Sequence, residues 1–182
     1  MSSLYIRNRT QDTSDNWVLV KLGGGGGGGI TAPSTDFTEI GEAGSLVEDT
    51  TSQSGEVISG STSGSAVKVF STDLEDVELG ACSLVMRAQF SNVNSTADAL
   101  IITVKAVNSV GAETLLNTFN ISPNMFSTNN VWECIGMGVN FNGDTESIMR
   151  VECVSATTST GITYKIDYVK VLPAVTALGS IG

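Results

Sequence analysis

The sequence contains no histidine among its 182 residues. Histidine is the usual general base near neutral pH and the commonest metal ligand, so its absence excludes Ser-His-Asp and Cys-His catalysis within this chain. The three cysteines, Cys82, Cys134 and Cys153, are an odd number and form no CxxC spacing. A complete disulfide framework, a zinc site or a CxxC redox centre is therefore not expected. We expect a protein that is not an enzyme and carries no cofactor or metal.

Charge is also scarce. Charged residues make up 15% of the chain, and 9 basic residues oppose 19 acidic ones for a formal net charge of −10. Surfaces that bind phosphates need clustered Lys and Arg, so we expect neither nucleic acid nor an anionic membrane as a partner. No apolar run approaches the length of a membrane span, and the opening MSSLYIRNRT has no apolar core typical of a secretion signal. We therefore expect synthesis in a cytoplasm.

What the sequence does contain is a run of seven glycines, Gly23 to Gly29. Residues 1–22, before this run, include two strand-like stretches separated by turn-forming residues. A hairpin of about twenty residues is marginal alone in water, so its apolar side chains need to be covered by something else. The glycines let this segment dock separately from the rest of the chain; the alternative is that glycine strands of several copies pack together. We predict that residues 1–22 are an anchor, with the side chains of Leu4, Ile6, Trp17 and Leu19 contacting a partner.

Two further segments have little apolar content. Residues 23–61 are rich in Gly, Ser and Thr, and we expect a flexible arm because such a composition buries too little apolar area to offset the entropy of ordering. Short strands at 45–47 and 56–58 are an open alternative within it. Residues 174–182 follow Pro173 and are expected to form a C-terminal tail.

Residues 62–173 have the pattern of a β domain. Runs rich in Val, Ile, Thr and aromatic residues recur between polar turns, and no stretch shows sustained helical periodicity. In residues 82–91, Cys, Leu, Met, Ala and Phe alternate with Ser, Val, Arg and Gln, which is typical of an antiparallel strand with one wetter face. Seven such runs predict an all-β, antiparallel β-sandwich that is jelly-roll-like, preceded by an extended N-terminal arm.

Residues 131–141 and 147–155 flank an Asn-Gly-Asp-Thr stretch, which predicts a hairpin. A four-residue loop places Cys134 directly opposite Cys153, and a shorter turn shifts the register but leaves both thiols on one face. Two free buried thiols and a cross-strand disulfide are both open at this point. On the opposite face Glu133 and Glu152 become diagonal neighbours, which we interpret as solvated acids and not as a catalytic carboxylate pair.

Aromatic residues are few, at 6% of the chain, although sugar binding relies on aromatic rings for stacking. The candidates for ligand contact are Trp132, Tyr164 and Tyr168. Their positions in strand-like runs also suit packing in a core or an interface.

The sequence GITYKIDYVKVLP, residues 161–173, resembles the closing strand of jelly-roll modules, both carbohydrate-binding modules and phage fibre or capsid-attached domains. In those proteins an Ile-Asp-x-Val-x-Val phrase returns the chain to the centre of the sheet. The whole layout resembles structural proteins of tailed-bacteriophage virions: a short β segment, a Gly-rich joint, a Ser/Thr/Gly arm and one all-β domain. Fibre repeats and coiled-coil heptads are missing, which favours a compact decoration or fibre-base piece over a long fibre.

This resemblance implies a non-enzymatic virion protein, such as a capsid decoration, head-fibre or tail-fibre subunit, made in the host cytoplasm. It would dock on capsid or tail proteins through its N-terminal segment, project the β domain and form a homo-oligomer such as a trimer. The alternative is a carbohydrate- or receptor-binding module of the same fold, with a host-surface glycan as ligand.

Overall fold

The computed structural model describes residues 37–74, 77, 79–142 and 147–173, together with the backbone of two strands near the N-terminus. Those two strands, β1 (Leu4–Arg7) and β2 (Trp17–Val20), pair with each other antiparallel, in agreement with the two strands expected there. The predicted contact side chains of Leu4, Ile6, Trp17 and Leu19 lie outside the described residues, as do the glycine run and the tail. The anchoring role therefore stays a prediction.

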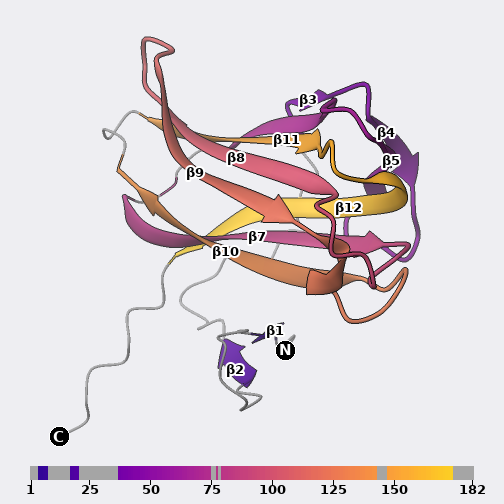
Figure 1. The fold of residues 1–182 in the computed structure, drawn as a ribbon. Helices are drawn as coiled ribbons and strands as arrows, with labels where there is room; N and C mark the ends of the chain where they lie inside the picture. The colour runs from indigo at the N-terminus through magenta and orange to yellow at the C-terminus, as the bar shows by residue number, and fades with distance from the viewer. Residues whose placement is uncertain are drawn as a thin grey trace, which may run out of the picture.

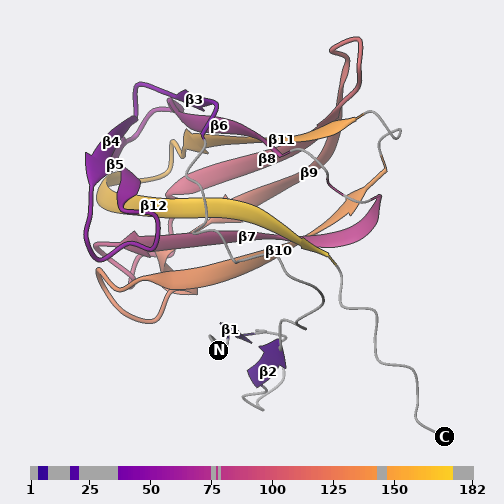
Figure 2. The same ribbon diagram turned by 180° about the vertical axis from the view of Figure 1, so that it is seen from behind.

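The remaining strands form two antiparallel five-stranded sheets that face each other (Figure 1; Figure 2). The first sheet has the order β10-β7-β12-β5-β4, and the second has the order β3-β6-β11-β8-β9. The strands are β3 (Glu39–Ile40), β4 (Gly44–Glu48), β5 (Glu56–Ser63), β6 (Lys68–Leu74), β7 (Gly80–Phe90), β8 (Leu100–Val107), β9 (Glu113–Ile121), β10 (Glu133–Phe141), β11 (Ile148–Ser155) and β12 (Thr160–Pro173). A single 3₁₀ turn, η1 (Pro123–Met125), is the helical element of the described chain, and no helix there is long and apolar enough to cross a membrane.

The connectivity from β5 to β12 is that of a jelly roll. Along the chain, successive strands from β5 to β12 alternate between the two sheets, except that β8 and β9 follow each other in the second sheet. The resulting orders, β5-β12-β7-β10 and β6-β11-β8-β9, are those of two interleaved Greek keys. The closing strand β12 lies at the centre of the first sheet, between β5 and β7, as the resemblance implied. The predicted all-β, jelly-roll-like antiparallel sandwich is confirmed.

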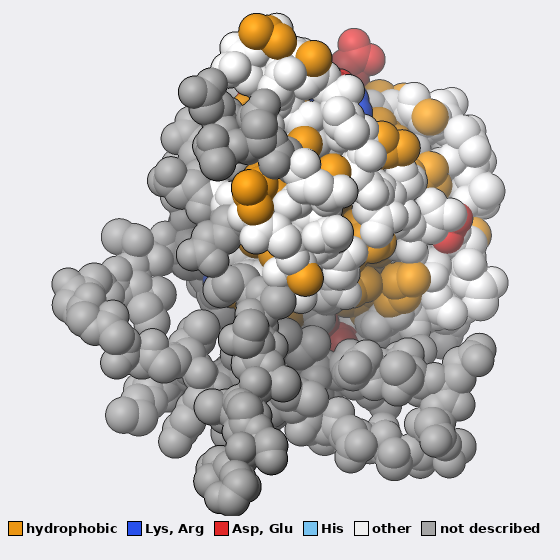
Figure 3. Space-filling view, turned by 90° about the vertical axis from the view of Figure 1, so that its left-hand side faces the viewer, with side chains coloured by type: hydrophobic (Ala, Val, Ile, Leu, Met, Phe, Trp, Pro, Cys, Tyr) orange, Lys and Arg blue, Asp and Glu red, His pale blue; other side chains and the backbone are white. Residues whose placement is uncertain are grey.

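The two sheets bury one apolar core between them. In β7 the predicted alternation holds, because Cys82, Leu84, Met86, Ala88 and Phe90 are all buried in this core. Figure 3 shows, on one side of the molecule, that the hydrophobic side chains left outside form small separate groups among polar atoms. Scattered apolar residues of this kind are normal on a folded surface and mark no docking patch by themselves.

Residues 39–61 are not a flexible arm. They form β3, β4 and β5, and β5 pairs with the central strand β12 along residues 58–63. The apolar content is low because β4 lies at the edge of its sheet, and because Gly44 and Gly60 sit where a side chain would strike neighbouring atoms. The prediction from composition therefore placed the start of the sandwich too late, whereas the alternative of short strands at 45–47 and 56–58 agrees with β4 and β5.

The predicted hairpin between residues 131–141 and 147–155 is also wrong. β10 pairs with β7 in the first sheet, whereas β11 pairs with β6 and β8 in the second. The connection lies within residues 142–147, of which 143–146 are outside the described part. In a jelly roll many consecutive strands cross between sheets, so a period of two identifies a strand but does not identify its partner.

Candidate functional site

The most elaborate polar cluster that the structure describes lies on the outer face of the first sheet, away from the core. Arg87 of β7, Cys134 of β10 and Tyr168 of β12 are neighbours there, because Arg87 is opposite both Cys134 and Tyr168 in the strand registers. A β-bulge in β12 between Ile166 and Tyr168 leaves both Asp167 and Tyr168 on this outer face, although strict alternation from Ile166 would have turned Tyr168 into the core. We call this region the outer face.

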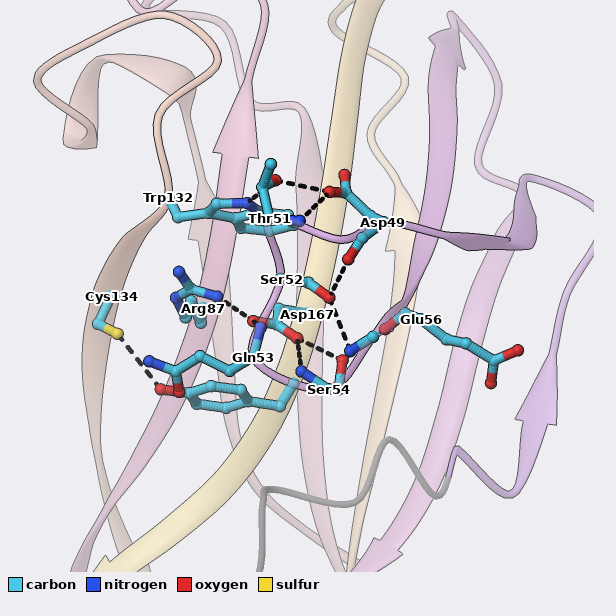
Figure 4. Close-up of polar contacts among 12 residues, drawn as sticks. Asp49, Thr51, Ser52, Gln53, Ser54, Glu56, Arg87, Trp132, Cys134 and Asp167 are labelled. Atoms are coloured by element: carbon cyan, nitrogen blue, oxygen red, sulfur yellow. Dashed lines mark hydrogen bonds and ion pairs between the residues drawn. The ribbon is translucent and has the colours of Figure 1, made fainter.

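Asp167 is the buried centre of the outer face. Its carboxylate is fully buried and forms an ion pair with Arg87. The other donors come from the loop of residues 49–55 between β4 and β5: the backbone N–H of Gln53 donates at 2.9 Å and that of Ser54 at 3.2 Å, and the Ser54 hydroxyl also donates (Figure 4). Carboxylates that receive several hydrogen bonds tolerate burial, so Asp167 holds this loop on the sheet.

The loop is also fixed by contacts at its start. The Asp49 carboxylate accepts from the Thr51 N–H at 2.9 Å and from the Thr51 hydroxyl at 2.6 Å, and it pairs with Lys165 Nζ at 2.7 Å. Hydrogen bonds from Lys165 and then from Thr51 lower the pKa of the Asp49 carboxyl to about 2. Asp49 therefore stays ionised far below neutral pH, and the loop is tied to β12 at both Asp49 and Asp167.

Trp132 stands at the edge of this loop. Its indole Nε1–H donates to Thr51 Oγ1 at 3.0 Å, and the Arg87 guanidinium carbon lies 4.9 Å from the ring centroid (Figure 4). Trp132 is half-buried, and a cation over an indole face at this distance is a favourable cation–π contact. Of the three aromatic residues predicted to contact a ligand, Trp132 is the one that keeps part of its surface accessible.

The two predicted tyrosines are covered. Tyr164 is 1% exposed within the core, and its hydroxyl donates to the backbone oxygen of Ala43 at 2.6 Å. Tyr168 lies on the outer face but is 2% exposed, with its hydroxyl 3.6 Å from Cys134 Sγ and Lys170 Nζ 4.5 Å from its ring centroid. Burial raises the pKa of both phenols. Neither ring offers a face for stacking, so these two residues are corrected to a core residue and a buried support.

The predicted disulfide has no geometric basis. Cys134 is half-buried on the outer face, Cys153 is buried in the core, and all three cysteines are free. Their strands belong to different sheets, so the two thiols face different environments. The alternative of two free thiols is the one that the structure supports.

We expect the folded protein to show one thiol, Cys134, that reacts with Ellman's reagent, and all three thiols to react after unfolding. Burial raises the pKa of the Cys82 and Cys153 thiols, which removes the reactive thiolate as well as access to it. A Cys134→Ser variant should have no reactive thiol when folded. Thiols that appear only after treatment with a reducing agent would instead demonstrate a disulfide.

The predicted pair of glutamates does not form. Glu133 accepts hydrogen bonds from Ser127 and Thr128 at the start of β10, whereas Glu152 pairs with Lys105 at 2.6 Å in the second sheet. Among the residues that the structure describes, no group of three or more His, Cys, Asp or Glu side chains could hold a metal ion. Every buried polar side-chain atom in that part of the chain has a hydrogen-bond partner.

Asp167 and the loop of residues 49–55 were missed by the sequence analysis. A signal was present in β12, where the buried residues step by two from Ile162 to Ile166 and then by three to Val169. Such a break in a period of two indicates a bulge, which leaves Tyr168 as well as Asp167 directed away from the core. The loop itself carried no signal, because its partner on β12 is more than one hundred residues away in sequence.

Comparison with known proteins gives fold-level likeness only. No family model and no curated protein matches this chain. Solved structures that resemble it include carbohydrate-binding modules of the β-sandwich superfamily with promiscuous specificity, at 11% identity over 93% of this chain and 72% of that one, with a TM-score of 0.49. A carbohydrate-binding module, CBM28, specific for non-crystalline cellulose has 12% identity over 72% and 82%, with a TM-score of 0.48.

The enzymatically active domain of tailspike protein 4 from bacteriophage CBA120 has 12% identity over 76% of this chain, with a TM-score of 0.49. This chain spans about a fifth of that structure, since the match covers 19% of it. With identities this low and TM-scores under 0.5, the likeness concerns the β-sandwich architecture. Jelly rolls occur in both lectin and viral capsid proteins, so function has to be argued from the site.

Proposed function

We propose that this domain is a non-catalytic module that binds saccharides on the outer face of its first sheet, with Trp132 as the central contact. The observation that carries the proposal is the fixed indole of Trp132, held by Thr51 through its Nε1–H and by Arg87 across its ring. An aromatic ring of this kind offers a flat apolar surface beside polar groups, which suits the apolar face of a sugar ring and its surrounding hydroxyls.

The restraint on Trp132 matters because ordering a side chain on binding opposes affinity. Here the side chain is already ordered in the folded protein. The Thr51 hydroxyl donates a hydrogen bond to the Asp49 carboxylate at 2.6 Å and accepts one from the indole N–H of Trp132. The outer face therefore presents an indole whose orientation does not have to be selected by the ligand.

The same contacts support binding without turnover. Glycoside hydrolysis needs two carboxyl groups on either side of the scissile bond. Asp49 and Asp167 are linked to Trp132 through Thr51 and Arg87, and they are held by Lys165 and by Arg87 together with the loop. The carboxylate of Glu133, the next residue in sequence, accepts hydrogen bonds from Ser127 and Thr128. Bound donors occupy each of these three carboxylates in the described part of the chain, an arrangement that suits binding better than proton transfer.

Replacing Trp132 with alanine is expected to weaken saccharide binding by about 30-fold or more, the range for removing an aromatic residue from the centre of an interface. The ligand would be found by applying the full chain to a glycan array and measured by isothermal titration calorimetry. Leu115→Ala is the matched control, since Leu115 is 63% exposed on β9 of the other sheet. Binding that Trp132→Ala leaves unchanged, or an array without any bound glycan, would overturn the proposal; released sugar would contradict the non-catalytic part.

For residues 1–22 we propose a separate role, attachment to a larger assembly such as a tailed-phage particle. This proposal is supported by the pairing of β1 with β2, whose eight residues are all apolar except Arg7. A lone two-stranded hairpin of this composition is marginal in water and favours burial against a partner. A chain beginning at residue 30 should fail to sediment with particles that the full chain binds; equal sedimentation of both would contradict the anchor.

A further inference from the structure

Lys170 differs from the other described cations of this protein. Three of the nine basic side chains, those of Arg7, Arg9 and Lys21, lie outside the described residues, which leaves six. Five of these six form ion pairs with carboxylates: Lys68, Arg87, Lys105, Arg150 and Lys165. Within the described part of the chain Lys170 has no carboxylate partner, although acidic residues outnumber basic ones by 19 to 9.

Lys170 is held in place in spite of having no ion pair. It is half-buried on β12, and its ammonium nitrogen lies 4.5 Å from the ring centroid of Tyr168. An ammonium group has three N–H donors, and a ring face on one side of it leaves the donors on the other side available. The result is a positioned ammonium group with donors free to bind an oxyanion.

Lys170 is connected to Trp132 by a series of neighbouring side chains on the outer face. The Arg87 guanidinium contacts the Trp132 ring, Arg87 lies opposite Tyr168 in the strand register, and Lys170 contacts the Tyr168 ring. Lys170 is two residues beyond Tyr168, or about 7 Å along the strand. A ligand that stacks on Trp132 and extends along β12 by more than one sugar unit would therefore come within reach of Lys170.

Among the described cations of the first sheet, Lys170 is the one whose charge is not offset by a bound carboxylate, although the sheet also carries Glu48 and Glu56. Arg87 is neutralised by Asp167 and Lys165 by Asp49, so Lys170 leaves this group of residues with one positive charge. The net charge of −10 opposes the approach of an anion at long range. At physiological ionic strength, however, interactions between exposed charges are screened beyond about 8 Å, so a direct contact with Lys170 dominates.

We propose that the saccharide bound on the outer face is acidic, and that Lys170 receives its carboxylate or sulfate group. This inference rests on the proposed function, since it specifies the class of saccharide that binds beside Trp132. A neutral saccharide would offer the Lys170 ammonium only hydroxyl and ring oxygens as acceptors, whereas an oxyanion would form a stronger hydrogen bond in which both partners are charged.

The test uses the full chain and two matched pairs of ligands: an oligomer of uronic acids with its carboxyl-reduced, neutral counterpart, and a sulfated oligosaccharide with its desulfated counterpart. We expect at least one acidic member to bind about 10-fold or more tightly than its neutral match, in line with one hydrogen bond to a charged group. The pair that shows the preference identifies the oxyanion as a carboxylate or a sulfate.

Lys170→Gln should lower affinity for the acidic member by about 10-fold and affinity for the neutral member by much less, so that the preference is lost, and Lys170→Arg should restore most of it. Lys68→Gln is the control for overall charge, because Lys68 lies in the second sheet and pairs with Glu39. The inference would be overturned if the acidic and neutral members bound equally well, or if Lys170→Gln and Lys68→Gln lost the same affinity for the acidic member. Either result would leave the saccharide-binding proposal intact. Failure of all four ligands and of the glycan array would overturn both.

Discussion

Replacing Gly60 with alanine is expected to destabilise the domain by about 3 kcal/mol or more, which is at or above the usual range for overpacking. A Cβ atom at this position would lie 2.2 Å from the backbone oxygen of Ala43 and 2.5 Å from the hydroxyl oxygen of Tyr164. These two atoms are themselves joined by a 2.6 Å hydrogen bond. The added methyl group would therefore separate a buried donor from its acceptor and push two strands apart.

The backbone around Gly60 has little room to adjust. Gly60 lies opposite Gly44 of β4 on one side and opposite Tyr164 of β12 on the other. A shift of β5 away from Ala43 would therefore disturb pairing with the central strand of the first sheet. Chemical unfolding in urea, followed by circular dichroism, measures the loss.

Gly138→Ala is the matched control. Gly138 lies on the edge strand β10, its backbone does not adopt a positive φ, and a Cβ atom there would have nothing within 4 Å. Alanine at such a position lowers the entropy of the unfolded chain, so Gly138→Ala should raise stability by about 0.5 kcal/mol. Equal unfolding midpoints for Gly60→Ala and the unsubstituted protein would show that β4 moves freely and does not belong to the sandwich.

Gly60 also explains why β4 and β5 were only an open alternative in the sequence, whereas the strands from β6 onward were predicted directly. Later strands such as β7, β8 and β11 bury apolar side chains at every second position, and this period of two is visible in sequence. β5 has only Val57 and Ile58 as buried apolar residues, and it contributes backbone pairing and the space that Tyr164 fills. A strand stabilised by backbone hydrogen bonds and close approach has no such periodic signature.

The site was predictable only where a single residue carries the signal. Trp132 was a candidate because sugar binding relies on aromatic rings for stacking and this chain has few of them. Tyr164 and Tyr168 looked equivalent to it, since alternation distinguishes two faces of a strand but does not say which of them is covered. The strands that pair with those of Cys134 and Cys153 could not be predicted from the sequence, because pairing in a jelly roll joins strands that are distant in sequence.

The second large effect is expected for Asp167→Ala, which should destabilise the protein by about 3–5 kcal/mol, the usual result of leaving a buried charge without its partner. The Arg87 side chain is 13% exposed and would lose its carboxylate. The backbone N–H groups of Gln53 and Ser54 would lose their acceptor at the same time. Urea unfolding measures the stability, and calorimetry with the saccharide measures the effect on Trp132.

Asp73→Ala removes a carboxylate from another ion pair with arginine and serves as the control. Asp73 and Arg150 are 21% and 30% exposed on the second sheet, where solvent screens the pair, so the loss should be about 1 kcal/mol or less. Arg150 lowers the pKa of the Asp73 carboxyl, so this small contribution is present above the unfolded pKa and is lost as the pH falls through the folded pKa. Similar losses for the two variants would mean that Asp167 is an ordinary surface carboxylate.

Asp167→Asn separates the charge of Asp167 from its shape. The asparagine oxygen can still accept from Ser54, but the amide N–H₂ on the other side would face the Gln53 N–H and the Arg87 guanidinium, which are donors. The loop of residues 49–55 should then detach from β12 at Gln53 while staying tied through Asp49 and Lys165. Because Thr51 would lose part of its support, the variant should bind saccharide more weakly than its remaining stability alone would predict. Affinity that follows only the folded fraction would show that the loop does not position Trp132.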